Sequence, residues 1–174
     1  MDDTLAERLA QIERRLDALE AASPEAEVPE AEGPEAPLPT AADFWALAGL
    51  RDRAGPPGAV LFTGLVDLPS GEHYEWQQGF PVEGIVESDW TALSPALAAL
   101  AHPTRLQILR EVLRGAGAAA ELQAVEGIES TGQLYHHVRQ LIAAGWLRTT
   151  GRAHYAVPGE RVIPLLVMMA CAQR

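Results

Sequence analysis

Residues 118–157 read AAAELQAVEGIESTGQLYHHVRQLIAAGWLRTTGRAHYAV, and this stretch decides the fold that we predict. Its pattern predicts a short helix over residues 118–125, a turn, and a longer helix over residues 132–144 that begins at a Ser or Thr cap. Two short extended runs follow and can pair as a hairpin across Gly151-Arg152. This is the layout of a winged helix-turn-helix, in which the second helix enters the DNA major groove and the hairpin reaches the neighbouring backbone.

The second helix of this pair has one apolar side and one polar side. Leu134, Val138 and Leu141 are spaced by four and three residues, so they should share the face that packs in the core. The polar side should then face the DNA, where Gln133 is a base-edge reader by residue type and arginines meet phosphates. The residues that we expect at the DNA are Ser130, Thr131, Gln133, Tyr135, His136, His137, Arg139, Gln140, Arg148 and Arg152.

The adjacent pair His136 and His137 raises the question of a metal or catalytic site. Adjacent helical residues point about 100° apart, whereas metal ligands on a helix are spaced at i and i+4, so we expect neither metal ligation nor catalysis. We expect His136 to face the DNA. For His137 two interpretations remain open: a DNA contact, or a partly buried side chain that is hydrogen-bonded to the backbone.

Two stretches carry a family resemblance. ALAALAHPTRLQILREVL (96–113) and GIESTGQLYHHVRQLIAAGWL (127–147) resemble the opening helix, and the turn and recognition helix, of the ArsR/SmtB family of bacterial winged-helix repressors. The Leu-Tyr-x-His form of the recognition helix is shared with the PadR type. The resemblance covers roughly residues 91–174 and implies a dimer that binds double-stranded DNA as a transcriptional repressor. It also implies that His137 matches the family's usual histidine and that His136 takes the more variable, DNA-facing position.

The resemblance bears on metal sensing as well. Family members that sense metals carry a Cys-x-Cys pair in the helix before recognition, or carboxylates and histidines in the last helix. This chain has Ala118, Ala119 and Ala120 near the first position and Cys171 alone near the second. The implied regulator is therefore of the non-metal-sensing type, with no cofactor.

Charge is distributed unevenly along the chain. The formal net charge is −11, which for the whole chain argues against nucleic acid. However, residues 1–40 carry −8 and residues 41–90 carry −6, whereas residues 91–174 carry +3. The basic part coincides with the predicted DNA-binding domain. Because the sequence has no Gly-rich phosphate loop, nucleophile elbow or zinc knuckle, we do not expect an enzyme.

Three features indicate the compartment. The lone Cys171 cannot form an intramolecular disulfide, and the N-terminus does not have the pattern of a signal peptide. The longest apolar run, residues 162–171, is too short to span a bilayer. We therefore expect a cytoplasmic protein with no membrane partner.

The first 40 residues divide into two segments. An a/d rhythm within residues 1–22 predicts a coiled-coil helix that self-associates, and the polar residues between the apolar ones form its solvated face. The alternative is an amphipathic helix that packs on its own domain. Residues 23–40 contain five Pro and five Glu, so we expect a disordered linker. The apolar residues of the seam are Leu5, Leu9, Ile12, Leu16 and Leu19.

Residues 41–90 should form an extension in front of the DNA-binding domain. We expect a short helix over residues 41–54, then a β-hairpin from residues 59–68 and 72–80 around Pro69-Ser70-Gly71. Ser88 or Asp89 should cap the next helix. The aromatic residues of this extension fit an apolar cover for a small domain better than a ligand pocket. They are Trp45, Phe62, Tyr74 and Trp76.

The last helix, over about residues 162–172, is apolar nearly all round. A helix of this kind at a chain end needs cover from another subunit, so we expect it to form a dimer core with the helix at residues 91–101. The interface residues are Val162, Ile163, Leu166 and Met169. The predicted fold is thus mainly α with small β (α+β), with residues 91–174 as the winged helix-turn-helix and dimerisation domain.

Three functions are compatible with this sequence. The first is a dimeric, sequence-specific DNA-binding transcriptional regulator that represses its targets. In the second, an unknown small-molecule effector gates this regulator through residues 41–90. The third is a winged-helix protein–protein adaptor that no longer binds DNA. The acidity of the whole chain favours the adaptor, whereas the placement of Arg139, Arg148 and Arg152 opposes it.

Overall fold

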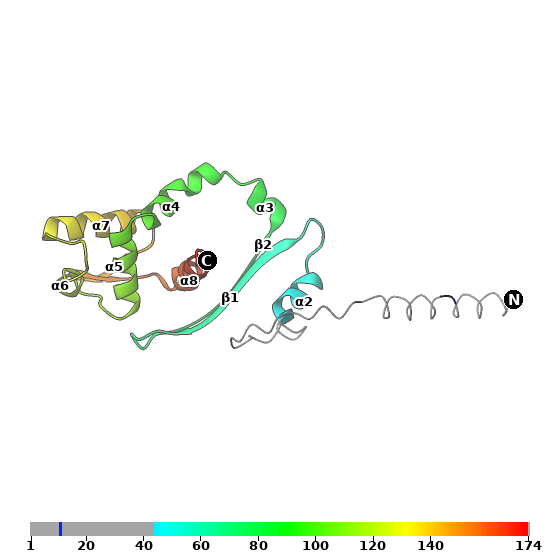
Figure 1. Cartoon of the computed structure of the whole chain (residues 1–174), viewed down its shortest axis with the longest axis horizontal. Coiled ribbons are helices and arrows are strands. Elements are labelled where there is room, and N and C mark those ends of the chain that lie inside the picture. The colour runs from blue at the N-terminus through cyan, green and yellow to red at the C-terminus, as the bar shows by residue number, and fades with distance from the viewer. Residues whose placement is uncertain (1–10, 12–43, 174) are drawn as a thin grey trace, which may run out of the picture. The chain divides into compact units, whose positions relative to one another are not determined.

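The computed structural model describes residue 11 and residues 44–173, and the latter lie in one compact unit, Thr40–Arg174. The described part is a mixed α+β structure with seven α-helices, one 3-10 helix and two antiparallel two-stranded sheets (Figure 1). The elements are α2 (Trp45–Arg51), β1 (Ala59–Asp67), β2 (His73–Pro81), α3 (Val82–Val86), η2 (Trp90–Leu93), α4 (Ser94–Leu100), α5 (Pro103–Leu113), α6 (Ala119–Leu122), α7 (Thr131–Ala143), β3 (Arg148–Gly151), β4 (His154–Ala156) and α8 (Gly159–Cys171).

Several predictions lie outside the described residues. They are the coiled-coil helix at 1–22 with Leu5, Leu9, Ile12, Leu16 and Leu19, and the linker at 23–40. In the part that the structure does describe, every helix is too short or too polar to cross a membrane.

The expected hairpin of the extension is confirmed. β1 and β2 pair over nine residues each, with Gly64 opposite Trp76 and Asp67 opposite His73. The connection closes through a hydrogen bond from the Leu68 N–H to the Glu72 carbonyl (2.9 Å). Both strands are rich in β-branched and aromatic residues, whose side chains pack well on a pleated surface.

After the hairpin, α3, η2 and α4 run back toward the rest of the domain (Figure 1). Asp89 caps η2, since its carboxylate accepts a hydrogen bond from the Thr91 N–H at 2.9 Å. The end of α4 is capped by a side chain from the next helix. Arg105 donates from Nε to the Ala99 carbonyl (2.6 Å) and from Nη2 to the Ala98 carbonyl (2.8 Å). These bonds satisfy carbonyls that a helix end leaves open.

The core is formed by α5, α6, α7 and the segment after α7. Leu134, Val138 and Leu141 are at most 1 % exposed, as their spacing predicted. They pack in one cluster with α5 and α6, and with the residues on either side of the second hairpin. The other fully buried side chains of this region include Ile108, Leu109 and Leu122. This cluster fixes α7 by one face and leaves the opposite face exposed.

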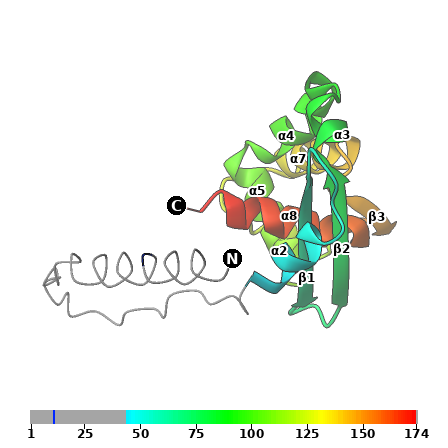
Figure 2. The same ribbon diagram turned by 90° about the vertical axis from the view of Figure 1, so that its right-hand side faces the viewer.

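α8 packs across the first hairpin (Figure 2). A Cβ on Gly64 would lie 2.7 Å from Ile163 Cγ2, and a Cβ on Gly159 would lie 3.1 Å from Tyr74 Cε1. Both glycines therefore permit close approach of strand and helix. Val162 and Ile163 are buried by this packing within a single chain.

Some boundaries differ from the sequence predictions. α6 ends at Leu122, and residues 123–127 form separate turns that close at Gly127, whose φ is +84°. The turn of the second hairpin is Arg152-Ala153 and not Gly151-Arg152, since Gly151 pairs with His154. Ala153 adopts a φ of +55°, a value that residues other than Gly seldom adopt.

Candidate nucleic-acid interface

The first turn of α7 is held by two reciprocal hydrogen bonds. Ser130 Oγ accepts from the Gln133 N–H at 3.3 Å, and Gln133 Oε1 accepts from the Glu129 N–H at 2.8 Å. The pair Ser130-x-x-Gln133 therefore acts in the manner of a capping box. Because the Gln133 carbonyl oxygen is engaged in this cap, its amide nitrogen is the group left free for an outside acceptor.

The polar side of α7 is exposed. Thr131, Gln133, Tyr135, His136, Arg139 and Gln140 are all exposed, as the helical phase predicted. Arg139 donates from Nε to the Tyr135 carbonyl at 3.1 Å, one turn back on the same helix. The helix thus presents one cation and several uncharged donors and acceptors on the face opposite its buried leucines.

His137 differs from its neighbour. It is half-buried, and its ring centroid lies 4.7 Å from that of His102 and 5.5 Å from that of His136. The Nδ1 atoms of His137 and His102 are both buried, with no hydrogen-bond partner among the described residues. The expected bond to the backbone is therefore not made by this nitrogen. Burial, followed by the nearby His102, His136 and Arg105, lowers the pKa of His137 from its usual 6.5.

The second hairpin is attached to the start of α6. The Ala119 N–H donates to the Ala153 carbonyl (2.9 Å), and the Tyr155 N–H donates to the Gly117 carbonyl (2.9 Å). This attachment fixes the wing relative to the helix pair. Arg148 at its base and Arg152 in its turn are both exposed.

Trp146 anchors the wing to the other side of the domain. It is 2 % exposed, and its Nε1 donates to the Ala96 carbonyl of α4 at 2.9 Å. The Arg161 guanidinium lies 4.9 Å from the centre of its ring, which adds a cation–π contact from α8. Sequence reasoning missed both Trp146 and His102, because their partners come from distant parts of the chain.

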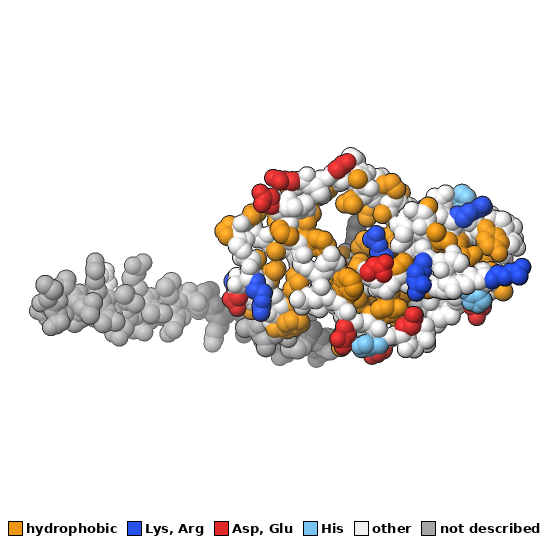
Figure 3. All heavy atoms as spheres, turned by 180° about the vertical axis from the view of Figure 1, so that it is seen from behind, with side chains coloured by type: hydrophobic (Ala, Val, Ile, Leu, Met, Phe, Trp, Pro, Cys, Tyr) orange, Lys and Arg blue, Asp and Glu red, His pale blue; other side chains and the backbone are white. Residues whose placement is uncertain are grey.

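The charges of this surface are mixed. Within residues 44–173, Arg139, Arg148 and Arg152 form no salt bridge, so their guanidinium groups are free to meet phosphates. Figure 3 shows arginine side chains in blue over this end of the molecule. Glu126 and Glu129 lie before the first turn of α7 and are exposed, so they oppose a phosphate at that point.

Metal binding finds no support in the described residues. No group of three or more His, Cys, Asp or Glu side chains there is arranged to hold a metal ion.

A comparison of sequences finds a helix-turn-helix domain in the same part of the chain as α6 and α7. Residues 100–150 match a family model described as a helix-turn-helix domain, which is related to the ArsR-type helix-turn-helix. This helix-turn-helix domain indicates DNA binding, and its family is not an enzymatic one. No curated protein matches the chain.

The matched segment includes most of the candidate interface. It runs from the end of α4 into β3 and contains all of α7 and Arg148. Arg152 in the wing turn lies just beyond it, as do α8 and the whole extension before α4.

Proposed function

We propose that this chain is a sequence-specific transcriptional repressor of the ArsR type that binds double-stranded DNA through α7 and the wing. One observation carries the proposal: α7 is fixed in the core by Leu134, Val138 and Leu141, while its opposite face is polar and exposed. A rigid helix with an exposed polar face is the form that fits a major groove about 12 Å wide.

The free side chains have complementary roles in this proposal. The Gln133 amide nitrogen and the exposed His136 read base edges, with Ser130, Thr131, Tyr135 and Gln140 around them. Arg139, Arg148 and Arg152 meet phosphates and fix the register. His137 supports the helix from inside and makes no direct contact, because its ring packs beside His102 and its Nδ1 is buried.

The regulator acts as a homodimer in this proposal. Leu93 at the end of η2 and Leu97 in α4 are 52 % and 55 % exposed and lie four residues apart, which supports an interface there. Leu166 and Met169 of α8 are partly exposed, and together with residues of α5 they line a groove that offers a second apolar contact. Val162 and Ile163 are already buried within one chain, so they contribute by positioning α8. We propose that residues 1–22 add a second contact between copies.

We assign one role to each segment of the chain. Residues 91–174 bind DNA and dimerise, residues 41–90 form the extension, and residues 23–40 link the extension to the first segment. The acidic charge of residues 1–90 keeps this part of the protein away from the DNA. We expect the protein to work in the cytoplasm.

A second candidate function is a regulator gated by a small molecule. The observation in its favour is an open pocket between α2 and the first hairpin, with a volume of about 600 Å³. A third, an adaptor without DNA binding, is favoured only by the net charge of −11.

Selection from a random duplex pool tests the leading proposal. A dimer should select a pseudo-palindromic site whose half-sites are separated by about 10 bp or a small multiple. The selected site should then bind at least a hundredfold more tightly than random duplex at the same salt concentration. If selection enriches no sequence and random duplex binds equally well, the adaptor becomes the better candidate.

A further inference from the structure

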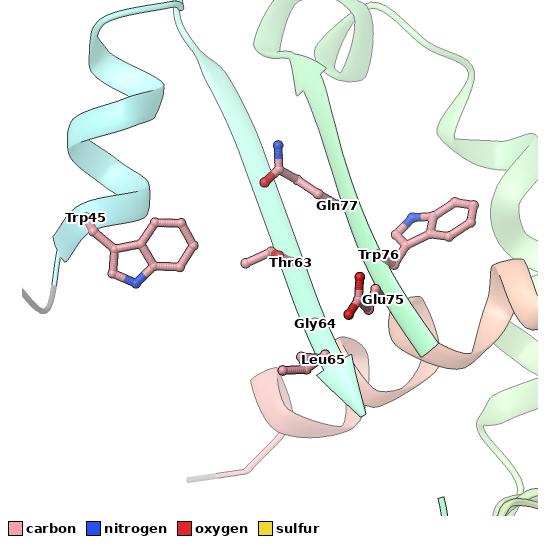
Figure 4. A pocket seen from close by; sticks show the side chains of 7 residues that line it. All are labelled: Trp45, Thr63, Gly64, Leu65, Glu75, Trp76 and Gln77. Carbon is pink, nitrogen blue, oxygen red and sulfur yellow. The ribbon is translucent and has the colours of Figure 1, made fainter. Parts of the chain in front are cut away.

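The extension carries a pocket that DNA binding does not use. It lies on the face of the first hairpin next to α2 (Figure 4). Thr63 and Leu65 of β1 and Glu75 and Gln77 of β2 project on this side, since alternate residues of a strand share a face. Trp76 projects on the other side of β2. The lining residues are Trp45, Thr63, Gly64, Leu65, Glu75, Trp76 and Gln77.

Two large apolar side chains border this pocket without cover from the described residues. Trp45 is 63 % exposed and Leu65 is 71 % exposed. The indole of Trp45 points from α2 toward the strands (Figure 4). An aromatic ring in this position has a free face, and an apolar ligand placed against it removes both side chains from water.

The polar side chains of the pocket favour a positive charge. No arginine lines it, and the one charged side chain in the lining is Glu75. Glu75 uses Oε1 in a contact with His73 Nε2 at 3.2 Å, which leaves Oε2 for another donor. Thr63 and Gln77 add neutral hydrogen-bonding groups beside it. Residues 41–90 carry a net charge of −6, so the surrounding potential attracts cations and repels anions.

From these observations we propose that the pocket binds a small organic cation that carries a flat apolar ring. The ring lies against Trp45 and Leu65, and the ammonium group lies near the carboxylate of Glu75. A cation beside an indole face gains a cation–π contact in addition to the ion pair. Few polar groups in a largely apolar lining are the usual composition of a small-molecule site.

The pocket and α8 lie on opposite faces of β1. Gly64 stands between Thr63 and Leu65, and its own face of the strand meets Ile163 directly. A ligand that displaces the strand therefore presses on α8. Any effect of the ligand on DNA binding rests on the proposed function, whereas the binding of the cation does not.

The test uses the full-length, ¹⁵N-labelled protein, whose four tryptophans give four indole N–H signals in an NMR spectrum. Three probes share a phenyl ring and differ in charge: 2-phenylethylamine, 2-phenylethanol and 3-phenylpropionate. The Trp45 signal, assigned through Trp45→Phe, should shift saturably with the amine, with at least threefold weaker binding of the alcohol. The carboxylate should give no saturable shift. The signal of the buried Trp146 should stay unchanged.

Two variants test whether the preference for the amine comes from the charge of Glu75 or from the shape of the pocket. Glu75→Gln should bring the amine and the alcohol within twofold of each other, whereas the matched variant Glu83→Gln, on α3, should keep the full preference. Equal binding of amine and carboxylate, a preference that survives Glu75→Gln, or no saturable Trp45 shift with any probe would overturn the proposal. A protein that binds the amine but selects no DNA site retains this inference and loses the proposed function. A protein that selects a DNA site but does not bind the amine retains the proposed function and loses this inference.

Discussion

The imidazole rings of His102 and His137 lie with their centroids 4.7 Å apart, and the Nδ1 of each is buried without a hydrogen-bond partner in the described part of the chain. His102 stands at the start of α5 and His137 at the centre of α7. The two rings therefore connect the domain's first core helix to the helix that we propose reads DNA.

The burial of His137, and then its proximity to His102, predicts a pH dependence of stability. The pKa of His137 is lowered in the folded protein, so the folded state binds fewer protons than the unfolded state between that lowered pKa and 6.5. The contribution is present above pH 6.5 and is lost as the pH falls through this window. The free energy of unfolding, measured by urea titration, should decrease on acidification below 6.5.

The variant His137→Gln should flatten this decrease, while His154→Gln, at an exposed wing position, should leave it unchanged. The pKa of His73 gives stability the opposite dependence on pH. Hydrogen bonds to Asp67 and Glu75 raise its pKa, so its contribution is present at low pH and disappears as the pH rises through the raised value. An acid decrease that is equally steep in His137→Gln would contradict the role of the ring pair.

Gln133 has two separable roles, in the helix cap and at the DNA. Gln133→Ala removes the bond to the Glu129 N–H and should cost about 0.5–1 kcal/mol of unfolding free energy. Gln133→Glu can keep that bond, because Glu also serves in a capping box, but it places a negative charge at the DNA. Thermal unfolding should show a loss only for the Ala variant, and DNA titration should show the larger loss for the Glu variant. Equal DNA affinity of Glu and wild type would place Gln133 away from the DNA.

Arg152 should act on every DNA sequence alike. It lies in the wing turn and forms no salt bridge with the described residues, so Arg152→Ala should leave the fold intact. Loss of one phosphate contact should reduce the slope of log affinity against log salt by about 0.9. Titrations on the selected site and on random duplex measure this slope, and Arg51→Ala on α2 is the control. A change of base preference with an unchanged slope would show that Arg152 reads a base.

Leu97 tests the proposed dimer without disturbing the core. Because this side chain is 55 % exposed in one chain, Leu97→Glu should keep the unfolding temperature of the isolated domain and yet prevent self-association through α4. Sedimentation should give a smaller particle, and affinity for the two-half-site operator should fall toward that for one half-site. The matched change Val60→Glu, on the exposed part of β1, should leave assembly unchanged. An intact, fully active Leu97→Glu dimer would move the interface elsewhere.

Gly64 tests the contact between the extension and α8. Gly64→Ala places a Cβ 2.7 Å from Ile163 Cγ2, and this overpacking should cost about 1–3 kcal/mol. Ile163→Val in the same chain should recover part of the loss. Gly79→Ala is a suitable control, because its Cβ would come no closer than 3.7 Å to any neighbour. If the two alanine variants unfold at the same denaturant concentration, the strand is not held against α8 in solution.

The periodic parts of this structure were predictable from sequence, and the long-range contacts were not. The spacing of Leu134, Val138 and Leu141 predicted which face of α7 is buried. Two runs rich in β-branched and aromatic residues, joined by a short connection with Gly, predicted the first hairpin. These patterns are local, because each follows from the geometry of a single element. The wing turn was misplaced by one residue because Ala153, rather than a glycine, takes the positive φ.

The contacts that position the candidate site join residues far apart in the sequence. His102 meets His137, and Trp146 bonds to Ala96, only after the helices have packed. Gln133 was predicted as a base reader from its residue type, whereas its bond to Glu129 depends on the conformation of the chain just before the cap. The two long-range pairings depend on tertiary packing and leave no periodic signal in the sequence, whereas the bond between Gln133 and Glu129 is local.

The contact between Gly64 and Ile163 forms late in synthesis, because Ile163 lies about 100 residues after Gly64 in the chain. The hairpin leaves the ribosome long before the helix on which it packs, because chains emerge N-terminal end first. Until α8 has been made, the strand face around Tyr74 has no cover from that helix and is open to chaperones or to other nascent chains. A chain that stops before α8 should therefore be recognised by quality control as incomplete, even though α5, α6 and α7 are already present.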